Sequence, residues 1–386
     1  MAAFVPEALV TQAQEATGLV DFGADGWQEG LGVFCAALDA EAQLNDLGVA
    51  ALGAQVTGAL ANRLKIVDWA KTHPEVTEVP VEAPLIVIGM FRGGTTFLSK
   101  LLDEDHRFRS LLRWESADPV PPATPENWRQ GPRVDACAAA GEMMEQLNPG
   151  FKKIHHEPAD GPTECVTLLA QDFKSILWST VTNTPGYTRW LFETDETTAY
   201  DYHHLALQVL QSGGVGGPWT LKTPHHAFFL RELTARYPDS ALVCTHRDPT
   251  VLAASVCSLV TSLAGTFTDG DHREQIARTW TWVLEECVGR MDAFRAARPD
   301  VEIVDVHYAD LVRDPVATMT DIYARTGIEM TDTARAAFAA YAEAHPRGEF
   351  GAHRYDFASL GLDEGELRER FAGYVERYAI PVEHVA

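Results

Sequence analysis

Cysteine and basic residues are scarce in this 386-residue chain. The six cysteines are scattered, with no CxxC pair and no zinc-ligand spacing, so we expect a reducing compartment and no metal site. Lys and Arg number 31 against 55 Asp and Glu, which gives a formal net charge of −24. A surface of that sign repels DNA, RNA and anionic lipid, and we therefore expect no nucleic-acid partner.

Long hydrophobic runs are also missing. No stretch approaches the ~20 apolar residues that a helix needs to cross a bilayer. The chain starts without the basic region and the apolar run that make a secretory signal. Together with the dispersed cysteines, these absences lead us to expect a cytoplasmic protein with no membrane-spanning segment.

The sequence does contain enough apolar residues for a large core. Hydrophobic residues make up 46% of the chain and charged residues 22%, which is the balance of a globular protein. From about residue 6 to residue 73, apolar positions recur every three or four residues and predict helices. The prolines at 80 and 84 mark a linker. We expect a helical extension over residues 1–80, packed on an α/β domain over residues 81–386 as one structural unit.

Short apolar runs after this linker have the pattern of buried strands. A continuous run bounded by turn residues is typical of a strand that is covered on both faces. Helical patterns separate the successive runs, and this alternation predicts a central parallel β-sheet flanked by helices. The runs cover residues 84–89, 219–222, 241–245 and 301–306.

A glycine-rich loop follows the first predicted strand and reads MFRGGTTF over residues 90–97. Glycines let successive backbone N–H groups converge on an anion, a helix N-terminus adds partial positive charge, and threonine hydroxyls donate hydrogen bonds. The loop is therefore a candidate phosphate site, although an ordinary glycine turn capped by threonine has the same residues. A Walker A motif would place lysine where Gly94 stands, so a P-loop kinase or ATPase is disfavoured.

A second motif, residues 245–249, ends another predicted strand with Arg247, Asp248 and Pro249, and Ser255 follows Arg247 by eight residues. An arginine at a strand end and a serine two turns into the next helix can face one phosphate from two sides. A helix start with an internal salt bridge is the alternative interpretation of Arg-Asp-Pro.

These motifs resemble those of the PAPS-dependent sulfotransferases, which use 3′-phosphoadenosine-5′-phosphosulfate (PAPS) and release 3′-phosphoadenosine-5′-phosphate (PAP). The loop resembles the family's 5′-phosphosulfate loop, and Arg247 with Ser255 resembles its 3′-phosphate grip. Arg347 and Gly348 resemble the segment that closes over that phosphate, with alanine at 309 replacing a glutamate in the segment before it. The segments keep the family's order over about residues 84–355, and the bacterial branch fits best.

The resemblance implies a P-loop nucleotide-kinase-like sulfotransferase fold and a set of site residues. Arg92 and Lys222 would lie beside the transferred sulfuryl group. Glu115 or His226 would accept the acceptor's proton, with His225 ranked behind them. Ion pairing of Glu115 with Arg113 or Arg92, and a helix start at the histidines, are the alternatives. The implied cofactor contacts are Arg92, Gly93, Gly94, Thr95, Thr96, Phe97, Arg247, Ser255, Arg347 and Gly348, although Phe97 fits a core position equally well.

The resulting prediction is transfer of a sulfuryl group from PAPS to a hydroxyl of a small-molecule acceptor, such as an alcohol, phenol, lipid or polyketide, without a metal. Two alternatives use the same fold. One is a small-molecule or nucleoside kinase, and the other is a non-catalytic nucleotide-binding protein.

Overall fold

The computed structural model describes residues 3–151, 156–345 and 355–383. The chain divides into two compact units, each made of three stretches. The first unit comprises Met1–Val81, Leu111–Gly216 and Leu259–Gln275, and the second comprises Glu82–Ser110, Gly217–Ser258 and Ile276–Ala386. Two long helices, α13 (Pro249–Phe267) and α14 (Arg273–Ala297), contribute residues to both.

The second unit is built on a five-stranded parallel sheet in the order β2-β3-β1-β4-β5. In register, Val87 of β1 lies between Lys222 of β3 and Val243 of β4. Every residue of β1 is buried, as the continuous apolar run predicts. The α/β fold with a parallel sheet is thus confirmed. The strands are β1 (Leu85–Gly89), β2 (Arg109–Ser110), β3 (Trp219–Lys222), β4 (Ala241–His246) and β5 (Ile303–His307).

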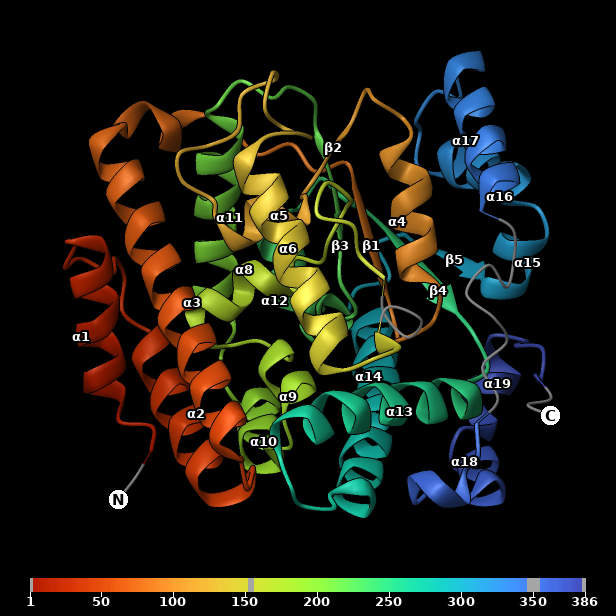
Figure 1. The fold of residues 1–386 in the computed structure, drawn as a ribbon. Helices are drawn as coiled ribbons and strands as arrows, with labels where there is room; N and C mark the ends of the chain where they lie inside the picture. The colour runs from red at the N-terminus through yellow and green to blue at the C-terminus, as the bar shows by residue number, and fades with distance from the viewer. Residues whose placement is uncertain (1–2, 152–155, 346–354, 384–386) are drawn as a thin grey trace. The chain divides into compact units, whose positions relative to one another are not determined.

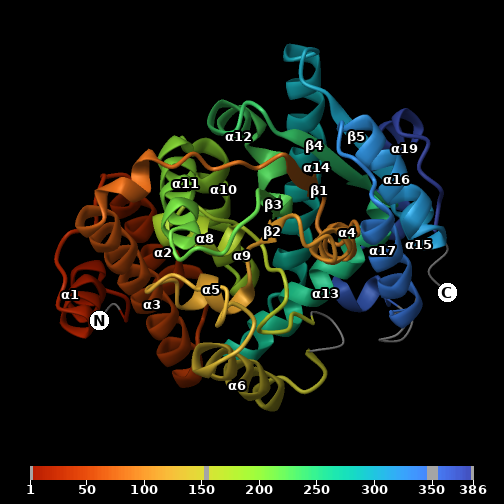
Figure 2. The same ribbon diagram turned by 90° about the horizontal axis from the view of Figure 1, so that it is seen from above.

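Alternate strand residues pack against helices on opposite faces of this sheet. Val87, Val243 and Val306 share a core cluster with residues of α4 (Thr95–Asp103), α16 (Pro315–Arg325) and α17 (Asp332–Ala344). Figure 2 shows α4 beside α17 and the short α15 (Tyr308–Arg313). On the other face, the Cys244 Sγ of β4 lies 3.9 Å from the Met291 Sδ of α14.

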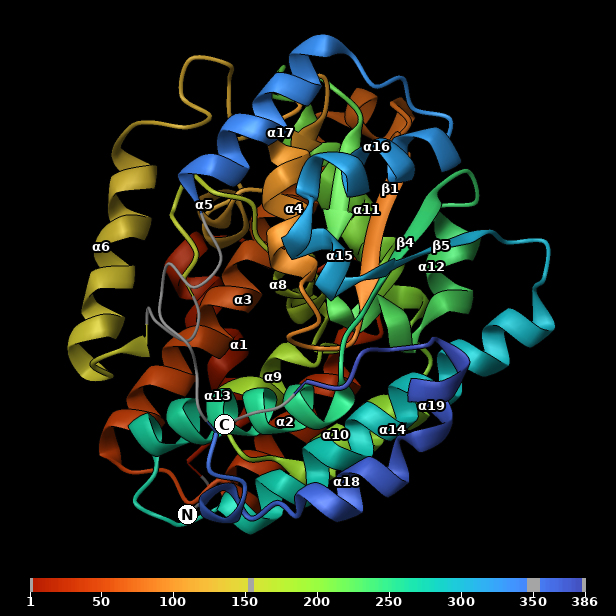
Figure 3. The ribbon, with the colours of Figure 1, turned by 90° about the vertical axis from the view of Figure 1, so that its right-hand side faces the viewer.

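The last helices of the second unit run along α14, as Figure 3 shows. They are α18 (Glu364–Arg370) and α19 (Ala372–Arg377), which follow the short turn η4 (Ala358–Leu360). Arg370 pairs with Glu285 at 2.9 Å, and Arg377 pairs with Asp292. Between β3 and β4 lie η3 (Pro224–Phe228) and α12 (Leu230–Arg236).

The first unit is helical, and its first three helices lie side by side in Figure 1. The carboxamide of Asn45 accepts a hydrogen bond from the Gly48 N–H at 2.8 Å and so fixes the start of the 27-residue α3. Its elements are α1 (Pro6–Thr17), α2 (Trp27–Glu41), α3 (Asp46–Thr72), η1 (Pro74–Glu78), α5 (Arg113–Ala117), α6 (Pro132–Leu147), α8 (Val166–Leu169), η2 (Ala170–Asp172), α9 (Leu177–Val181), α10 (Pro185–Glu193) and α11 (Thr197–Gln211).

Helix α13 corrects one expectation from the sequence. With 19 residues and a mean hydropathy of 1.7, it is long and apolar enough to cross a membrane, whereas we expected no such stretch. Of this apolar stretch, 67% is buried inside the protein. A buried core helix meets the same criteria of length and composition, so α13 is weak evidence for a membrane span.

Candidate functional site

The loop between β1 and α4 adopts a conformation that its glycines make possible. Gly89 has φ of 140°, and a Cβ there would lie 2.8 Å from the Thr245 carbonyl oxygen of β4. Gly94 has φ of 100°, and a Cβ there would lie 2.6 Å from the ring of Tyr308. The Gly93 N–H donates to the Met90 carbonyl at 3.1 Å and closes the turn. Side chains at these positions would clash with their neighbours, so the close packing of this loop requires glycine.

The loop ends at the N-terminus of α4, where an anion can bind. Gly94 is the N-cap and, in the described part of the chain, no side chain caps this helix. The first N–H groups of an uncapped helix point outward and carry partial positive charge. The geometry therefore matches a phosphate or sulfate cradle.

Lys222 lies on the neighbouring strand β3 and is 2% exposed. Its Nζ is 3.5 Å from the Oγ1 of Thr96, in the first turn of α4. A buried ammonium beside the start of this helix adds a full positive charge to the partial charge of the backbone. Lys222 thus lies next to the loop, while its place beside the transferred sulfuryl group stays a prediction.

Arg92 and Ser255 come from the two separate motifs and are in direct contact. The Nε of Arg92 donates to the Ser255 Oγ at 3.1 Å, and the Tyr355 hydroxyl donates to the same oxygen at 2.9 Å. Arg92 itself has a left-handed backbone, with φ of 65°. The resemblance assigned Arg92 to the 5′ end of the cofactor and Ser255 to the 3′ end, and the structure joins the two side chains.

Arg247 follows the end of β4 and reaches back to the loop. Its Nη1 donates to the Arg92 carbonyl at 3.3 Å, and its guanidinium lies 4.2 Å from the centre of the Tyr308 ring. Its Nε and Nη2 donate to the two carboxylate oxygens of Glu383 at 2.7 and 2.9 Å. Arg247 is thus held on three sides within the second unit.

His225 and His226 form part of η3, directly after β3, and both are buried. The Thr223 hydroxyl accepts a hydrogen bond from the His225 N–H at 3.3 Å and begins this short helix. The His225 ring lies 4.9 Å from the ring of Phe229. The helix-start interpretation therefore describes their backbone correctly, while their role in proton transfer stays a prediction.

Glu115 belongs to the first unit, where it lies in α5 and is fully buried. Its Oε2 accepts hydrogen bonds from the Leu112 N–H at 3.2 Å and from the Trp128 indole N–H at 3.0 Å. This carboxylate closes the first turn of its own helix, an arrangement that we did not anticipate. Its role as a base also stays a prediction.

Two other predicted contacts have different outcomes. Phe97 packs against the core cluster between the sheet and α17, with its ring 6.2 Å from that of Tyr341. Of the two interpretations of Phe97, a cofactor contact and a core position, this packing matches the core position. Arg347 and Gly348 lie outside the described residues.

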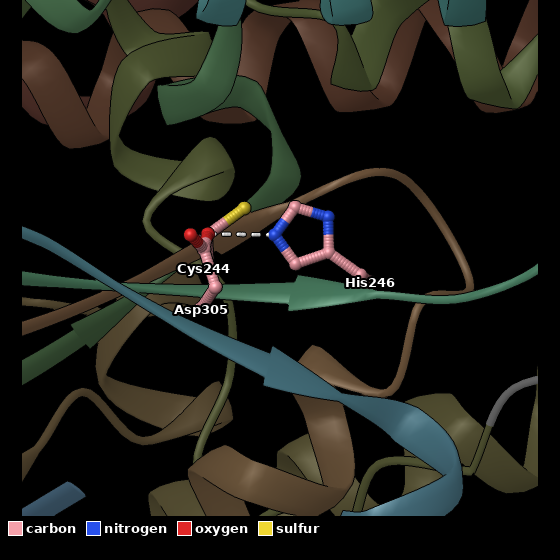
Figure 4. Close-up of side chains that lie close together, drawn as sticks. All are labelled: Cys244, His246 and Asp305. Carbon is pink, nitrogen blue, oxygen red and sulfur yellow. Dashed lines mark hydrogen bonds and ion pairs between the residues drawn. The ribbon is translucent and has the colours of Figure 1, made fainter. Parts of the chain in front are cut away.

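Three potential metal-binding side chains, Cys244, His246 and Asp305, lie within 4.8 Å of one another on β4 and β5 (Figure 4). The His246 Nε2 is 2.7 Å from the Asp305 Oδ1, and Arg295 also pairs with that carboxylate. Burial alone would lower the pKa of His246, but Cys244 and Asp305 raise it to about 9. Because a protonated imidazole and a neighbouring guanidinium repel cations, this cluster is better described as an ion-pair network.

Two residues of the second unit escaped sequence reasoning. Tyr308 contacts both the glycine loop and Arg247, although we gave it no role from the sequence. Glu383 is 136 residues from Arg247 in the chain, so no local spacing could connect them. The aromatic residue directly after β5 was the only available signal for Tyr308.

Comparisons with known proteins agree with this geometry. The model of the sulfotransferase family matches residues 84–332, which include the glycine loop, Lys222, Arg247 and Ser255. The structure of sulfotransferase STF9 from Mycobacterium avium has 33% sequence identity and a TM-score of 0.89, with 98% of each chain covered. Sulfotransferase STF1 from Mycobacterium tuberculosis H37Rv has 32% identity and a TM-score of 0.86, covering 96% of this chain and 99% of that one. No curated protein matches the sequence. The chain belongs to the sulfotransferase family, as a member of its bacterial branch.

Proposed function

We propose that this sulfotransferase takes its sulfuryl group from PAPS and transfers it to a hydroxyl of a small molecule. The observation that carries the proposal is the hydrogen bond from Arg247 to the Arg92 carbonyl. It connects the glycine loop at the end of β1 with the arginine motif at the end of β4. PAPS carries anionic groups at both its 5′ and its 3′ ends. Such a donor matches the glycine loop and the Arg247 motif, because this hydrogen bond holds the two side by side.

In this proposal the loop and Lys222 hold the 5′-phosphosulfate. The N–H groups at the start of α4 and the hydroxyls of Thr95 and Thr96 donate hydrogen bonds to its oxygens. The bond between sulfur and the bridging oxygen breaks as the acceptor oxygen bonds to sulfur. Lys222 neutralises the charge that grows on the bridging oxygen, which leaves with PAP.

Arg247 and Ser255 hold the 3′-phosphate. Arginine presents a planar fork of N–H donors to phosphate oxygens, and a serine hydroxyl adds a further donor. Arg347 and Gly348 complete this contact by resemblance to the family. The net charge of −24 makes local cations necessary, because the overall field of the protein repels such a ligand.

The acceptor's proton passes to Glu115 or to His226. Glu115→Gln and His226→Gln test them separately. Loss of the true base lowers kcat by about 10²- to 10⁴-fold and changes KM little. Loss of the other residue leaves kcat within severalfold of the wild-type value.

The proposed donor is tested by calorimetric titration of PAP into the protein and into Arg247→Ala. We expect PAP to bind the wild type, and Arg247→Ala to bind it at least about 100-fold more weakly while unfolding at nearly the same temperature. Equal affinities would contradict the proposal.

The two alternative functions have separate tests. ATP with Mg²⁺ should stabilise the protein against heat less than PAP does, and the opposite order would favour a kinase. Sulfation of a panel of alcohols and phenols distinguishes an enzyme from a non-catalytic binding protein.

A further inference from the structure

The geometry points to Glu383 as a positioning residue for recognition of the 3′-phosphate, acting through Arg247. The inference rests on the proposed use of PAPS. Glu383 lies beyond the last helix of the second unit, far in the sequence from both motifs of the site. In this assignment its carboxylate aims the guanidinium of Arg247 and contacts no ligand itself.

The first step of the argument is the geometry of the ion pair. Both oxygens of Glu383 are engaged, one by Nε and the other by Nη2 of Arg247. A paired contact of this kind fixes the plane of the guanidinium as well as its position. The ring of Tyr308 at 4.2 Å supports that plane from one face.

The second step is a count of the donors that remain. A guanidinium has five N–H groups. The described residues engage three of them, namely Nε, one on Nη2 and one on Nη1. The pair is also partly open to solvent, with the Arg247 side chain 20% exposed. Arg247 can therefore keep its partner and still donate to a phosphate.

The third step is the support of Glu383 itself. Its backbone N–H donates to the Asp248 Oδ2 at 2.8 Å, and its carbonyl accepts from the Arg368 Nη2 at 3.4 Å. Asp248 also accepts from the Thr250 N–H at 2.9 Å at the start of α13, the helix that carries Ser255. Glu383 is thus tied to the start of the same helix as Ser255. A carboxylate that moves away when the phosphate binds would not need such anchoring. The contacts therefore favour positioning of Arg247 over competition with the ligand.

The two roles predict opposite changes in affinity. A carboxylate near a phosphate site repels the phosphate, so a competing Glu383 would weaken binding and its removal would tighten it. A positioning Glu383 removes the need to order a flexible arginine at the moment of binding, and its loss weakens binding. The direction of the change therefore identifies the role.

The experiment measures PAP and adenosine 5′-monophosphate affinities by calorimetry for the wild type, Glu383→Ala, Glu383→Gln and Glu366→Ala. Glu366 is the matched control, because it pairs with Arg370 in α18 and does not contact Arg247. We expect Glu383→Ala to bind PAP about tenfold more weakly, with a smaller loss for Glu383→Gln, which keeps the shape. Affinity for adenosine 5′-monophosphate, which has no 3′-phosphate, should stay unchanged, and Glu366→Ala should match the wild type.

A double-mutant cycle with Arg247→Lys supplies a readout that a purely structural role would not move. Lysine has no planar fork to aim, so Glu383→Ala should have little further effect on PAP affinity in that background. Tighter or unchanged PAP binding by Glu383→Ala overturns the inference, and so does an equal loss for both nucleotides. A wild type that binds PAP no better than adenosine 5′-monophosphate overturns the proposed donor site as well. Glu383→Gln provides the same test if Glu383→Ala does not fold.

Discussion

The two units each contain an arginine paired with a carboxylate, and the two pairs differ in what surrounds them. In the first unit, the side chains of Arg63 and Asp172 are 3% and 0% exposed. In the second unit, those of Arg247 and Glu383 are 20% and 28% exposed. Both arginines also lie against a tyrosine ring, at 4.5 Å for Arg63 and 4.2 Å for Arg247.

The donors of Arg63 are committed to its own unit. Besides Asp172, it donates to the carbonyls of Phe22, Ala24 and Gln171. Burial raises the pKa of Asp172 even though Arg63 acts in the opposite direction. The pair of Arg63 and Asp172 is buried, and the described residues engage four of the five Arg63 donors, so this closed pair serves the fold. The pair of Arg247 and Glu383 is partly exposed, and the described residues engage only three of the five Arg247 donors, so this open pair can serve a ligand.

The largest effect that we expect is on stability, from Arg63→Ala. Removing one partner of a buried pair leaves an uncompensated carboxylate, which costs about 3–5 kcal/mol. Denaturant unfolding measures the loss. The control is Arg298→Ala, because Arg298 pairs with Asp300 at the exposed surface, and we expect it to cost under ~1 kcal/mol. A similar cost for both variants would show that burial does not make the pair of Arg63 and Asp172 more important for stability than an ion pair at the surface.

The next effect concerns His246, the residue before Arg247. Its pKa rises from 6.5 to about 9 on folding, so the folded state favours the protonated form. The resulting stability is fully present below pH 6.5 and is lost as pH rises toward 9, by at most ~3 kcal/mol. Unfolding free energies at pH 6 to 9 test this, and His246→Gln should flatten the decline. The titratable and charged groups around His246 are Cys244, Asp305, Arg295, His307, Tyr374 and Tyr378.

A flat or rising stability over that pH range would show that His246 is neutral in the folded protein. The expected decline would instead show that a protonated His246 pairs with the partly exposed Asp305, next to the open pair at the end of β4.

A smaller effect is expected from Gly94→Ala, which disturbs the support of the open pair. The positive φ of Gly94 and the close approach of Tyr308 make alanine strained there, at about 1–3 kcal/mol. Displacement of Tyr308 should also weaken PAP binding. Gly58→Ala is the matched control, because a Cβ there meets nothing within 4 Å and the residue lies within α3. Thermal unfolding with and without PAP measures both effects, and equal behaviour of the two variants would contradict the expectation.

The smallest effect is expected from Tyr308→Leu. Loss of a cation–π contact with Arg247 removes about 0.5–2 kcal/mol, or roughly two- to thirtyfold in PAP affinity. Tyr202→Leu removes the corresponding ring beside Arg63 and should lower stability without a preference between PAP and adenosine 5′-monophosphate. If both variants changed the affinities for both nucleotides equally, the open pair would have no special connection to the 3′-phosphate.

Sequence patterns predicted the fold well where the signal was local. The apolar runs located β1, β3, β4 and β5, because strands buried on both faces need continuous hydrophobic residues. The strand β2 has only two residues, too few to create a pattern. Because α13 is largely buried, it is rich in apolar residues and meets the length and hydropathy criteria for a membrane span. We did not expect this from the sequence.

The candidate site was predictable only within each motif. Spacing within the sequence predicted the loop and the placing of Arg247 and Ser255, and the resemblance to the family added Lys222. It could not reveal that Arg92 contacts Ser255, because that contact depends on how far the β1 loop turns toward α13. Nor could it connect Glu383 with Arg247, since tertiary contacts across 136 residues leave no period in the sequence.

The strand order also determines when the sheet can form during synthesis. The central strand β1 pairs with β3 and β4, whose residues begin 130 or more positions later in the chain. A ribosome that adds ~5–20 residues per second needs roughly 7 to 26 s to make the intervening segment. During that interval, β1 is an unpaired apolar strand on a nascent chain, which makes it a natural binding segment for a chaperone.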